Sequence, residues 1–267
     1  MVAAAAAIYG LAVSPAFAVR TIETRGAVLT GDAAVIAALD LATRPPGVAG
    51  SGAAVAASSA VVASAAPVPQ ADNVFTLKTG PLAARVVTLP TVASATVTAS
   101  LPDAIRVNVV EREPILAWSV GTRRLLVDRD GLVLLDAAAP EAPAAAHDLG
   151  HTLPAIVDAR PGSAGLAAGG HVDPIDLDAA TRLASLQPRD VGSKAKALAV
   201  AVTDADGWVV STTGGWDAVF GFYTATVRPP DLVPPQVRLL RSLLAGREAQ
   251  VGRVMLASGD AGTYTLR

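Results

Sequence analysis

The side chains with the clearest potential for chemistry are three histidines. His147 and His151 are four residues apart, a spacing at which two imidazoles on one helix face can bind a metal ion. Prolines and a glycine crowd this pair, no third ligand is near it in the sequence, and His171 is isolated in a Gly-rich segment. We therefore interpret the segment around His147 as a solvated loop and predict no metal site.

Two short acidic runs are the next candidates. Asp128–Gly131 and Asp204–Gly207 resemble fragments of calcium-binding loops, but neither is followed by the glutamate that completes an EF-hand. Both runs lie between strand-forming residues, and Asp-Gly is a common centre for a β-hairpin turn. We predict that both are hairpin turns rather than ion sites.

Catalytic motifs are absent from the sequence. It contains no Gly-x-Ser-x-Gly elbow, phosphate-binding loop or dinucleotide fingerprint, and it has no cysteine for thiolate catalysis or metal ligation. Glu111 and Glu113 flank Arg112 just before Pro114, and an ion-paired domain junction explains this cluster better than acid–base catalysis. The sequence therefore predicts a protein that is not an enzyme and uses no cofactor.

Composition narrows the classes of partner. The 267 residues carry a net charge of -2 without a basic patch, which argues against nucleic acid, and no feature points to a small-molecule substrate. Hydrophobic residues make up 52% of the chain but aromatic residues only 4%, so alanine and valine supply most of the apolar side chains. The core must then depend on many small contacts. The length accommodates two modest domains or one large one.

An uncharged stretch, Val2–Val19, opens the chain. Its eighteen residues are near the lower limit of a membrane-spanning helix, which is about 17 to 25 residues. It contains Pro15, no lysine or arginine precedes it, and Ala16-Phe17-Ala18 imitates a signal-peptidase site. Three interpretations remain open: a membrane anchor, a cleaved signal, or a buried alanine-rich helix. Either of the first two places the rest of the chain outside the cytoplasm.

The next hundred residues predict a small α+β unit. Its expected elements are a strand over Phe17–Thr24, a helix capped by Thr30 with Val35, Ile36 and Leu39 on its apolar face, a helix opening at Pro81, and two strands of alternating apolar and polar residues within 92–99 and 105–109. Between the helices, residues 43–72 are rich in Ala, Ser, Gly and Pro, which is typical of a surface insertion. We expect two helices covering one face of a three-stranded sheet.

The second half predicts a mainly antiparallel β domain with helices. The expected elements are a hairpin over Leu125–Leu135, a loop over Asp136–Gly150, a helix over Asp176–Leu186, a hairpin of Ala197–Val202 with Trp208–Val210, a strand over Ala218–Val227, a helix over Pro234–Ala245, and strands over Val251–Ala257 and Thr263–Leu266.

Several of these segments together resemble the bacterial cell-division family FtsQ/DivIB. The residues that carry the resemblance are, in order, Phe17–Val19 with Ile22 and Gly26, Leu89–Val92 with Ala95 and Val97, Leu101-Pro102, Val107–Pro114 (VNVVEREP), Trp118, and Leu126–Asp128 with Gly131. The resemblance implies a single-pass protein of the bacterial inner membrane, with an anchor over 1–19, a POTRA domain over 20–112 and an FtsQ-type β domain over 113–267. The family's basic cytoplasmic tail is missing ahead of the anchor, so we expect an anchor truncated on its N-terminal side, from a wrongly assigned start or a lost tail.

The resemblance also implies a role and a working surface. Members of this family are non-enzymatic scaffolds at the division site that bind FtsB/FtsL-type partners and, through them, influence septal peptidoglycan synthases. A partner adds a strand near the C-terminal end of the β domain. The matching residues here are Val251, Arg253, Val254, Met255, Ala257 and Tyr264. The alternative is that these are ordinary sheet residues.

Other functions remain as alternatives. The chain could be a POTRA-containing component of polypeptide transport, although it is too short to include a membrane β-barrel of alternating strands. It could also be a secreted protein with a cleaved signal, or a secreted enzyme whose site has no recognisable motif. A deep polar pocket with perturbed carboxylates or histidines would favour the enzyme.

Overall fold

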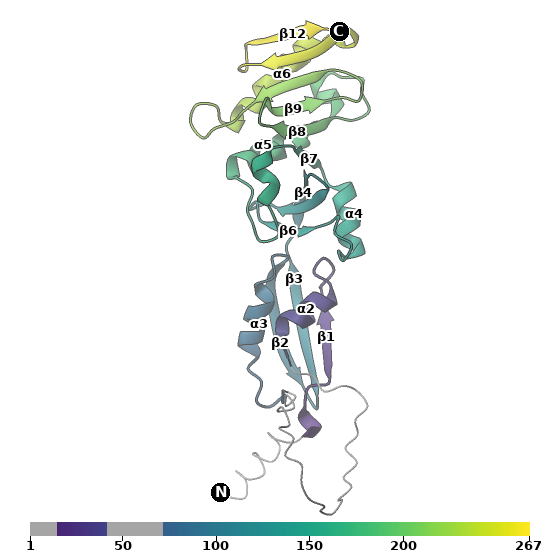
Figure 1. The fold of residues 1–267 in the computed structure, drawn as a ribbon, viewed down its shortest axis with the longest axis vertical. Coiled ribbons are helices and arrows are strands. Elements are labelled where there is room, and N and C mark those ends of the chain that lie inside the picture. The colour runs from purple at the N-terminus through teal and green to yellow at the C-terminus, as the bar shows by residue number, and fades with distance from the viewer. Residues whose placement is uncertain (1–14, 42–71) are drawn as a thin grey trace, which may run out of the picture. The chain divides into compact units, whose positions relative to one another are not determined.

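The computed structural model describes residues 15–41 and 72–267. The chain divides into two compact units, of which the first ends at Glu111 and the second begins at Arg112 (Figure 1). The division falls within the cluster Glu111–Pro114 that the sequence marks as a junction. Most of the predicted insertion, residues 43–71, lies outside the described residues, as does the start of the predicted anchor, residues 1–14.

The first unit is a three-stranded sheet with two helices. Its elements are η1 (Pro15–Phe17), β1 (Thr21–Arg25), α2 (Asp32–Leu39), α3 (Thr79–Val87), β2 (Val92–Ser100) and β3 (Ala104–Glu111). The strand order is β1-β3-β2, with β3 parallel to β1 and antiparallel to β2. This order of strand, helix, helix, strand and strand confirms the α+β unit predicted from the sequence.

Alternation along β3 explains how this sheet gains its core. Ile105, Val107 and Val109 are buried, whereas Arg106 and Asn108 between them are exposed. The buried set also includes residues from both helices and from the entry segment: Val19, Val35, Leu39, Val74, Leu82, Val86, Val92 and Val97. The helices therefore cover one face of the sheet, because a period of two brings every second side chain to the same side.

Two details of the first helix differ from the sequence prediction. Gly31, not Thr30, is the N-cap of α2, and no side chain caps it. The Thr30 hydroxyl instead lies 2.7 Å from the hydroxyl of Thr91. Ile36 is 40% exposed, so the apolar face of this short helix consists of Val35 and Leu39.

The C-terminal end of the uncharged stretch belongs to the folded unit. Ala18 and Val19 are 5% and 0% exposed, and Ala18 forms an antiparallel bridge with Asn73. Ala18 and Val19 therefore belong to the first unit, although the sequence predicted an anchor that extends to residue 19. Among the residues that the structure describes, no helix has both the length and the apolar character to cross a bilayer.

The second unit is built on a nine-stranded sheet. Its strands are β4 (Pro114–Val120), β5 (Arg123–Asp128), β6 (Val133–Asp136), β7 (Ala155–Asp158), β8 (Ala199–Thr203), β9 (Gly207–Ser211), β10 (Asp217–Gly221), β11 (Val251–Leu256) and β12 (Gly262–Leu266). Their order is β12-β11-β10-β9-β8-β7-β4-β5-β6. The pairs β4–β7, β7–β8 and β10–β11 are parallel and the others are antiparallel, which agrees with a mainly antiparallel domain.

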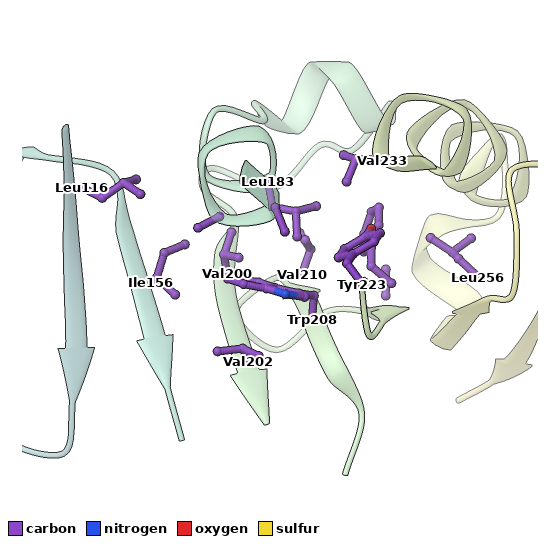
Figure 2. Packing of buried hydrophobic residues seen from close by; sticks show 14 of the residues in the cluster. Leu116, Ile156, Leu183, Val200, Val202, Trp208, Val210, Tyr223, Val233 and Leu256 are labelled. Atoms are coloured by element: carbon purple, nitrogen blue, oxygen red, sulfur yellow. The ribbon is translucent and has the colours of Figure 1, made fainter. Parts of the chain in front are cut away.

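The helices of the second unit are α4 (Ala144–Thr152), α5 (Pro174–Ala184) and α6 (Val233–Leu244), with short 3-10 turns at η2 (Pro161–Gly165), η3 (Pro188–Val191), η4 (Pro230–Leu232) and η5 (Glu248–Gln250). Side chains from successive strands meet Leu183 of α5 and Val233 of α6 in one apolar layer (Figure 2). The α4 helix packs against β4 and β5. It covers the other face of the sheet, since its buried Ala146 is not part of the layer under α5 and α6.

Several elements of this unit differ from the sequence prediction. The predicted loop over Asp136–Gly150 contains the start of α4, where Gly150 lets the helix approach Ala137 and Arg124 closely. The strand β7 follows it without having been predicted, because a four-residue strand inside a sheet gives little periodic signal. The strand β10 ends at Gly221, so Phe222 lies outside it and is 51% exposed.

The predicted helices and C-terminal strands of this unit are otherwise confirmed. α5 begins at Pro174, earlier than predicted, and its N-cap is Asp173, whose carboxylate accepts the N–H groups of Ile175 and Asp176. α6 and the β11–β12 hairpin lie within a residue or two of their predicted positions. The hairpins at Asp128–Gly131 and Asp204–Gly207 also form as predicted.

Candidate functional site

The histidine pair lies on a helix but does not form a metal centre. His147 and His151 are both on α4, which corrects the prediction of a loop, and Arg124 Nη1 is 2.7 Å from His151 Nδ1. A guanidinium only donates, so this imidazole nitrogen must accept. Within residues 15–41 and 72–267, no group of three or more potential metal-ligating side chains comes together.

The acidic run at Asp128 is a structural turn. Asp128 is 3% exposed, and its Oδ1 accepts the backbone N–H groups of Asp130 and Leu132, each at 2.9 Å. Its Oδ2 accepts a hydrogen bond from Arg112 Nη1 at 3.1 Å. All of these bonds hold the turn between β5 and β6, so the carboxylate has a purely architectural use.

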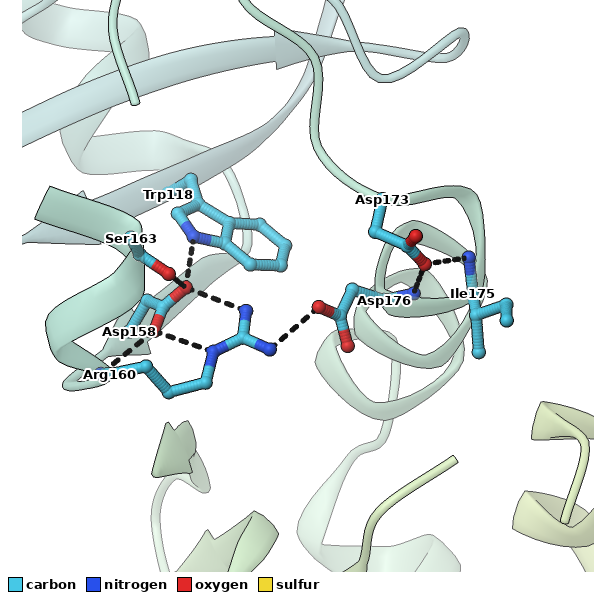
Figure 3. A network of polar contacts seen from close by, with 7 residues as sticks. All are labelled: Trp118, Asp158, Arg160, Ser163, Asp173, Ile175 and Asp176. Carbon is cyan, nitrogen blue, oxygen red and sulfur yellow. Dashed lines mark hydrogen bonds and ion pairs between the residues drawn. The ribbon is translucent and has the colours of Figure 1, made fainter. Parts of the chain in front are cut away.

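A second buried carboxylate lies at the end of β7, in a polar network (Figure 3). Arg160 binds Asp158 through two nitrogens, at 3.0 Å and 2.8 Å, and its third reaches Asp176 at 2.7 Å. Trp118 Nε1 and Ser163 Oγ also donate to Asp158, at 3.1 Å and 2.7 Å. Burial alone would raise the pKa of the Asp158 carboxyl, but the hydrogen bonds from Arg160 and Ser163 hold it below its usual value.

A cavity of about 520 Å³ opens beside this network and is lined by Trp118, Asp158, Arg160, His171 and Asp204 among others. Its most buried carboxylate is ionised and already bound by a guanidinium, so it is a poor general base. The network therefore supports the loops that follow β7.

The open edge of the large sheet is the feature that no intramolecular contact explains. β12 is the terminal strand, and no other segment of residues 15–41 or 72–267 pairs with its outer side. Four of its five residues are exposed, with Tyr264 at 37% and Leu266 at 63%. An unpaired strand edge is a template on which another chain can add a strand.

The hydrogen-bond register shows which residues of β12 face outward. Ala257 N–H donates to the Ala261 carbonyl at 3.0 Å, and Val254 pairs with Tyr264 three positions further along the hairpin. Hydrogen-bonded and non-bonded pairs alternate in an antiparallel ladder. Thr263 and Thr265 therefore bond to β11. The N–H and C=O groups of Gly262, Tyr264 and Leu266 point to the open side.

The predicted partner-binding residues differ in how far their side chains are exposed. Val251 and Val254 are fully buried under α6, so their side chains belong to the core. Met255 is 52% exposed and Ala257 is also exposed, whereas Arg253 forms an ion pair with Asp206 at 2.5 Å.

The strand that carries most of these residues has no free edge. β11 pairs with β10 on one side and with β12 on the other, so an added strand cannot bond to it directly. At this edge the accessible backbone is that of β12, the strand that carries the predicted residue Tyr264. Gly262 and Leu266 share its outward side and were not among the predicted residues, although their alternate placement with Thr263 and Thr265 is a signal present in the sequence.

A buried polar network holds β11 in place. Gln236 of α6 is fully buried, and its amide nitrogen donates to the carbonyls of Phe220 and Leu256 at 3.2 Å and 3.1 Å. Its oxygen accepts from the Tyr223 hydroxyl at 2.7 Å, and burial raises the pKa of that hydroxyl. Arg228 donates to the same two carbonyls. The ends of the parallel strands β10 and β11 are therefore tied together.

Glu248 anchors the entry to β11. Its carboxylate accepts hydrogen bonds from the Ser193 hydroxyl, from Lys194 N–H at 3.1 Å and from Trp216 Nε1 at 3.1 Å. Burial alone would raise the pKa of Glu248, but these bonds lower it below its usual value. On the next strand, the Tyr264 hydroxyl accepts from Arg247, whose guanidinium also lies 5.6 Å from the ring centroid.

The predicted junction residues have other partners than those expected. Glu111 binds the backbone N–H groups of residues 28–30 at 2.6 to 3.0 Å, inside the first unit. Arg112 pairs with Asp128 at 3.1 Å rather than with its glutamate neighbours, because Asp128 is buried beside it. Glu113 lies 3.8 Å from Arg129, and Pro114 begins β4.

Comparison with known proteins identifies the first unit. Residues 51–112 match the family model described as "POTRA domain, FtsQ-type". A 59-residue segment is 46% identical to the cell division protein FtsQ of Chloroflexus aurantiacus, over 22% of each protein. A 71-residue segment is 37% identical to FtsQ of Mycobacteroides abscessus, over 27% of this chain and 23% of that protein.

These matches are local: the aligned segments span less than a quarter of each curated relative. The match to the family model takes in α3, β2 and β3 and begins after β1 and α2, and both relatives bear the name FtsQ that its description contains. The chain therefore contains an FtsQ-type POTRA domain, joined to a large β-sheet unit, and over the matched segments it is similar to cell-division proteins of the FtsQ/DivIB family.

Proposed function

We propose that this protein is a non-enzymatic scaffold of the bacterial division machinery. It is anchored in the cytoplasmic membrane by the uncharged residues before Ala18, with both folded units on the extracytoplasmic side. It binds FtsB/FtsL-type partners and so helps link division-complex assembly to septal peptidoglycan synthesis. The FtsQ-type POTRA match, the similarity to proteins named cell division protein FtsQ and the sequence of the first residues support this proposal.

The single observation that carries the binding role is the open backbone of β12. A partner segment that adds a strand there forms main-chain hydrogen bonds with Gly262, Tyr264 and Leu266, and its side chains meet those of the exposed threonines and Leu266. Met255 of β11 and Ala257, which follows that strand, lie one strand further in, where they contact the partner only at its margin.

Proline at Leu266 tests strand addition directly. Leu266→Pro removes an outward N–H but no bond to β11, and proline is tolerated on an edge strand whose N–H faces solvent. We expect the affinity for a purified FtsB/FtsL-type partner to fall about tenfold, which corresponds to about 1.4 kcal/mol. The matched variant Leu266→Ala keeps the N–H and should lose less. Equal affinity for the proline variant and the wild-type chain refutes strand addition at this edge.

Localisation tests the scaffold itself. A tagged full-length protein should concentrate at midcell in dividing cells and sediment with membranes. Uniform release into the medium would instead identify a cleaved secreted protein.

A further inference from the structure

The first unit gathers exposed apolar side chains at the end where the chain enters it. Phe17 and Phe75 stack edge to face with ring centroids 4.8 Å apart, yet 49% of Phe75 is exposed. Leu101, in the turn between β2 and β3, is 62% exposed. We call Phe17, Phe75 and Leu101 the entry tip.

Backbone contacts bring the three residues to one end of the sheet. Val74 N–H donates to the Phe17 carbonyl at 2.9 Å, which fixes the segment of Phe75 beside the entry strand. Arg20 N–H donates to the Asp103 carbonyl at 2.9 Å, so the β2–β3 turn lies next to the start of β1. Figure 1 shows this turn and the start of β1 at the same end of the unit.

No linker separates the entry tip from the uncharged stretch. Ala18 and Val19 are buried in the first unit, and the residues from Val2 to Phe17 carry no charge. If these residues enter a bilayer, as the proposed function holds, the folded unit starts where the membrane ends. Exposed phenylalanine and leucine at that level gain free energy by burial at the boundary of headgroups and acyl chains.

Charges at this end balance. Arg20 and Lys78 are exposed there, since Lys78 precedes α3 and α3 runs antiparallel to β2. Asp72 and Asp103 supply two negative charges against these two positive ones, and Arg20 lies 3.9 Å from Asp103. Attraction to anionic lipid is therefore not what would hold the tip on a membrane, and apolar contact remains.

We propose that the entry tip inserts into the headgroup region of the bilayer and holds the POTRA domain against the membrane surface. The partner is a lipid surface, and the inference rests on the proposed membrane anchor. Insertion gives the first unit a second attachment besides the chain itself, which restricts its rotation relative to the bilayer.

The absence of cysteine makes a clean test possible. Leu101→Cys and Val28→Cys each carry a single label, and the two native residues are equally exposed, at 62%. Val28 lies at the other end of the sheet, where its N–H binds the Glu111 carboxylate at the end of β3. A polarity-sensitive fluorophore is attached to each full-length variant, which is then reconstituted into two sets of vesicles, one without nitroxide lipids for the emission spectrum and one with headgroup nitroxide lipids for quenching.

We expect a several-fold rise in emission, a shift to shorter wavelength and nitroxide quenching for the label at 101, with none of these for the label at 28. Equal responses at the two positions, in protein that floats with the vesicles, overturn the insertion while leaving the anchor intact. Protein that does not float with vesicles overturns both.

A third variant protects the test against a local folding defect. Phe75→Cys carries the same label on a different segment and should respond as the label at 101 does. Zwitterionic and anionic vesicles should give the same response, because the local charge is balanced. A response at 101 that appears only with anionic lipid would overturn apolar insertion.

Discussion

The two edges of the nine-stranded sheet end in different ways. At β6, both backbone groups of Val133 are used: its N–H donates to the Gly170 carbonyl at 2.9 Å, and its C=O accepts from Gly169 at 2.8 Å. Leu132 and His171 form a bridge beside them. At β12, the outward groups of Gly262, Tyr264 and Leu266 meet no other segment of the described chain.

The covered edge at β6 serves the fold, whereas the edge at β12 is available for the proposed binding of a partner. Proteins normally cover or interrupt a sheet edge, because a bare edge invites pairing with other chains. The 169–172 segment covers β6, whereas within residues 15–41 and 72–267 nothing pairs with the outer side of β12 at the opposite end of the sheet. An unpaired edge can accept an added strand, which supports the binding role proposed for β12.

The largest expected effect comes from loosening the turn that leads into the covered strand β6. Asp128→Ala removes the acceptor for Asp130 N–H and Leu132 N–H and leaves Arg112 without its buried partner. We expect a loss of about 2 to 3 kcal/mol in the free energy of unfolding, measured by urea denaturation. Asp130→Ala is the control, since the Asp130 side chain is exposed and its carboxylate lies 3.8 Å from Arg112, which is too far for a hydrogen bond.

Partner affinity at β12 should be unchanged in the folded fraction of Asp128→Ala. A fall in affinity without a fall in stability would show that the two edges are coupled, and the separation of architecture from recognition would be wrong.

The next effect tests what keeps the bare edge ordered. Gln236→Ala leaves the Tyr223 hydroxyl without an acceptor, although Arg228 still binds the carbonyls of Phe220 and Leu256. We expect a loss of about 1 to 3 kcal/mol in stability, together with weaker partner binding because β11 supports β12. Arg238→Ala, on the exposed side of the same helix, should change neither. Unaltered stability in Gln236→Ala would contradict the role of this network.

A pH dependence follows from Glu248 at the entry to β11. Its folded pKa is lowered, so the unfolded state binds more protons and the carboxylate stabilises the fold above its unfolded pKa of about 4.3. This stabilisation is lost as pH falls through the folded pKa. Thermal unfolding of Glu248→Gln should therefore show a flatter decline of Tm below about pH 4 than the wild-type chain. The exposed Glu141→Gln is the control, and a decline identical to wild type would count against Glu248.

The strands at the two edges could be predicted from the sequence, but their positions in the sheet could not. β3, β5, β6, β11 and β12 alternate or lie around Asp-Gly turns, so local pattern is enough to find them. The position of a strand at an edge depends on long-range pairing, and the sequence contains no local trace of the parallel pairs that place β7 and β10. For this reason β11 and β12 were predicted as strands, but the sequence could not show that β11 lies inside the sheet and β12 at its edge.

The polar residues inside the core could not be recognised from the sequence either. Gln236 lies between two prolines and Val237 in a helix whose apolar face is clear, and nothing in the sequence distinguishes it from an exposed glutamine. Its buried amide is satisfied by one carbonyl from β10, one carbonyl from β11 and the hydroxyl of Tyr223, which come together only in the folded domain. Asp158 and Arg160 are two residues apart, and this spacing was the one local signal for the network of Figure 3.

The smallest expected effect is at Arg253, which the sequence placed on the partner surface. Its ion pair with Asp206 joins two side chains that are 43% and 33% exposed, and such pairs contribute about 1 kcal/mol or less. Arg253→Ala should therefore change stability little, and a double-mutant cycle with Asp206→Ala measures the coupling. Because Arg253 lies one strand in from the bare edge, its removal should also cost less affinity than Leu266→Pro. A larger loss at Arg253 would mean that the partner lies across the face of β11 rather than along the edge of β12.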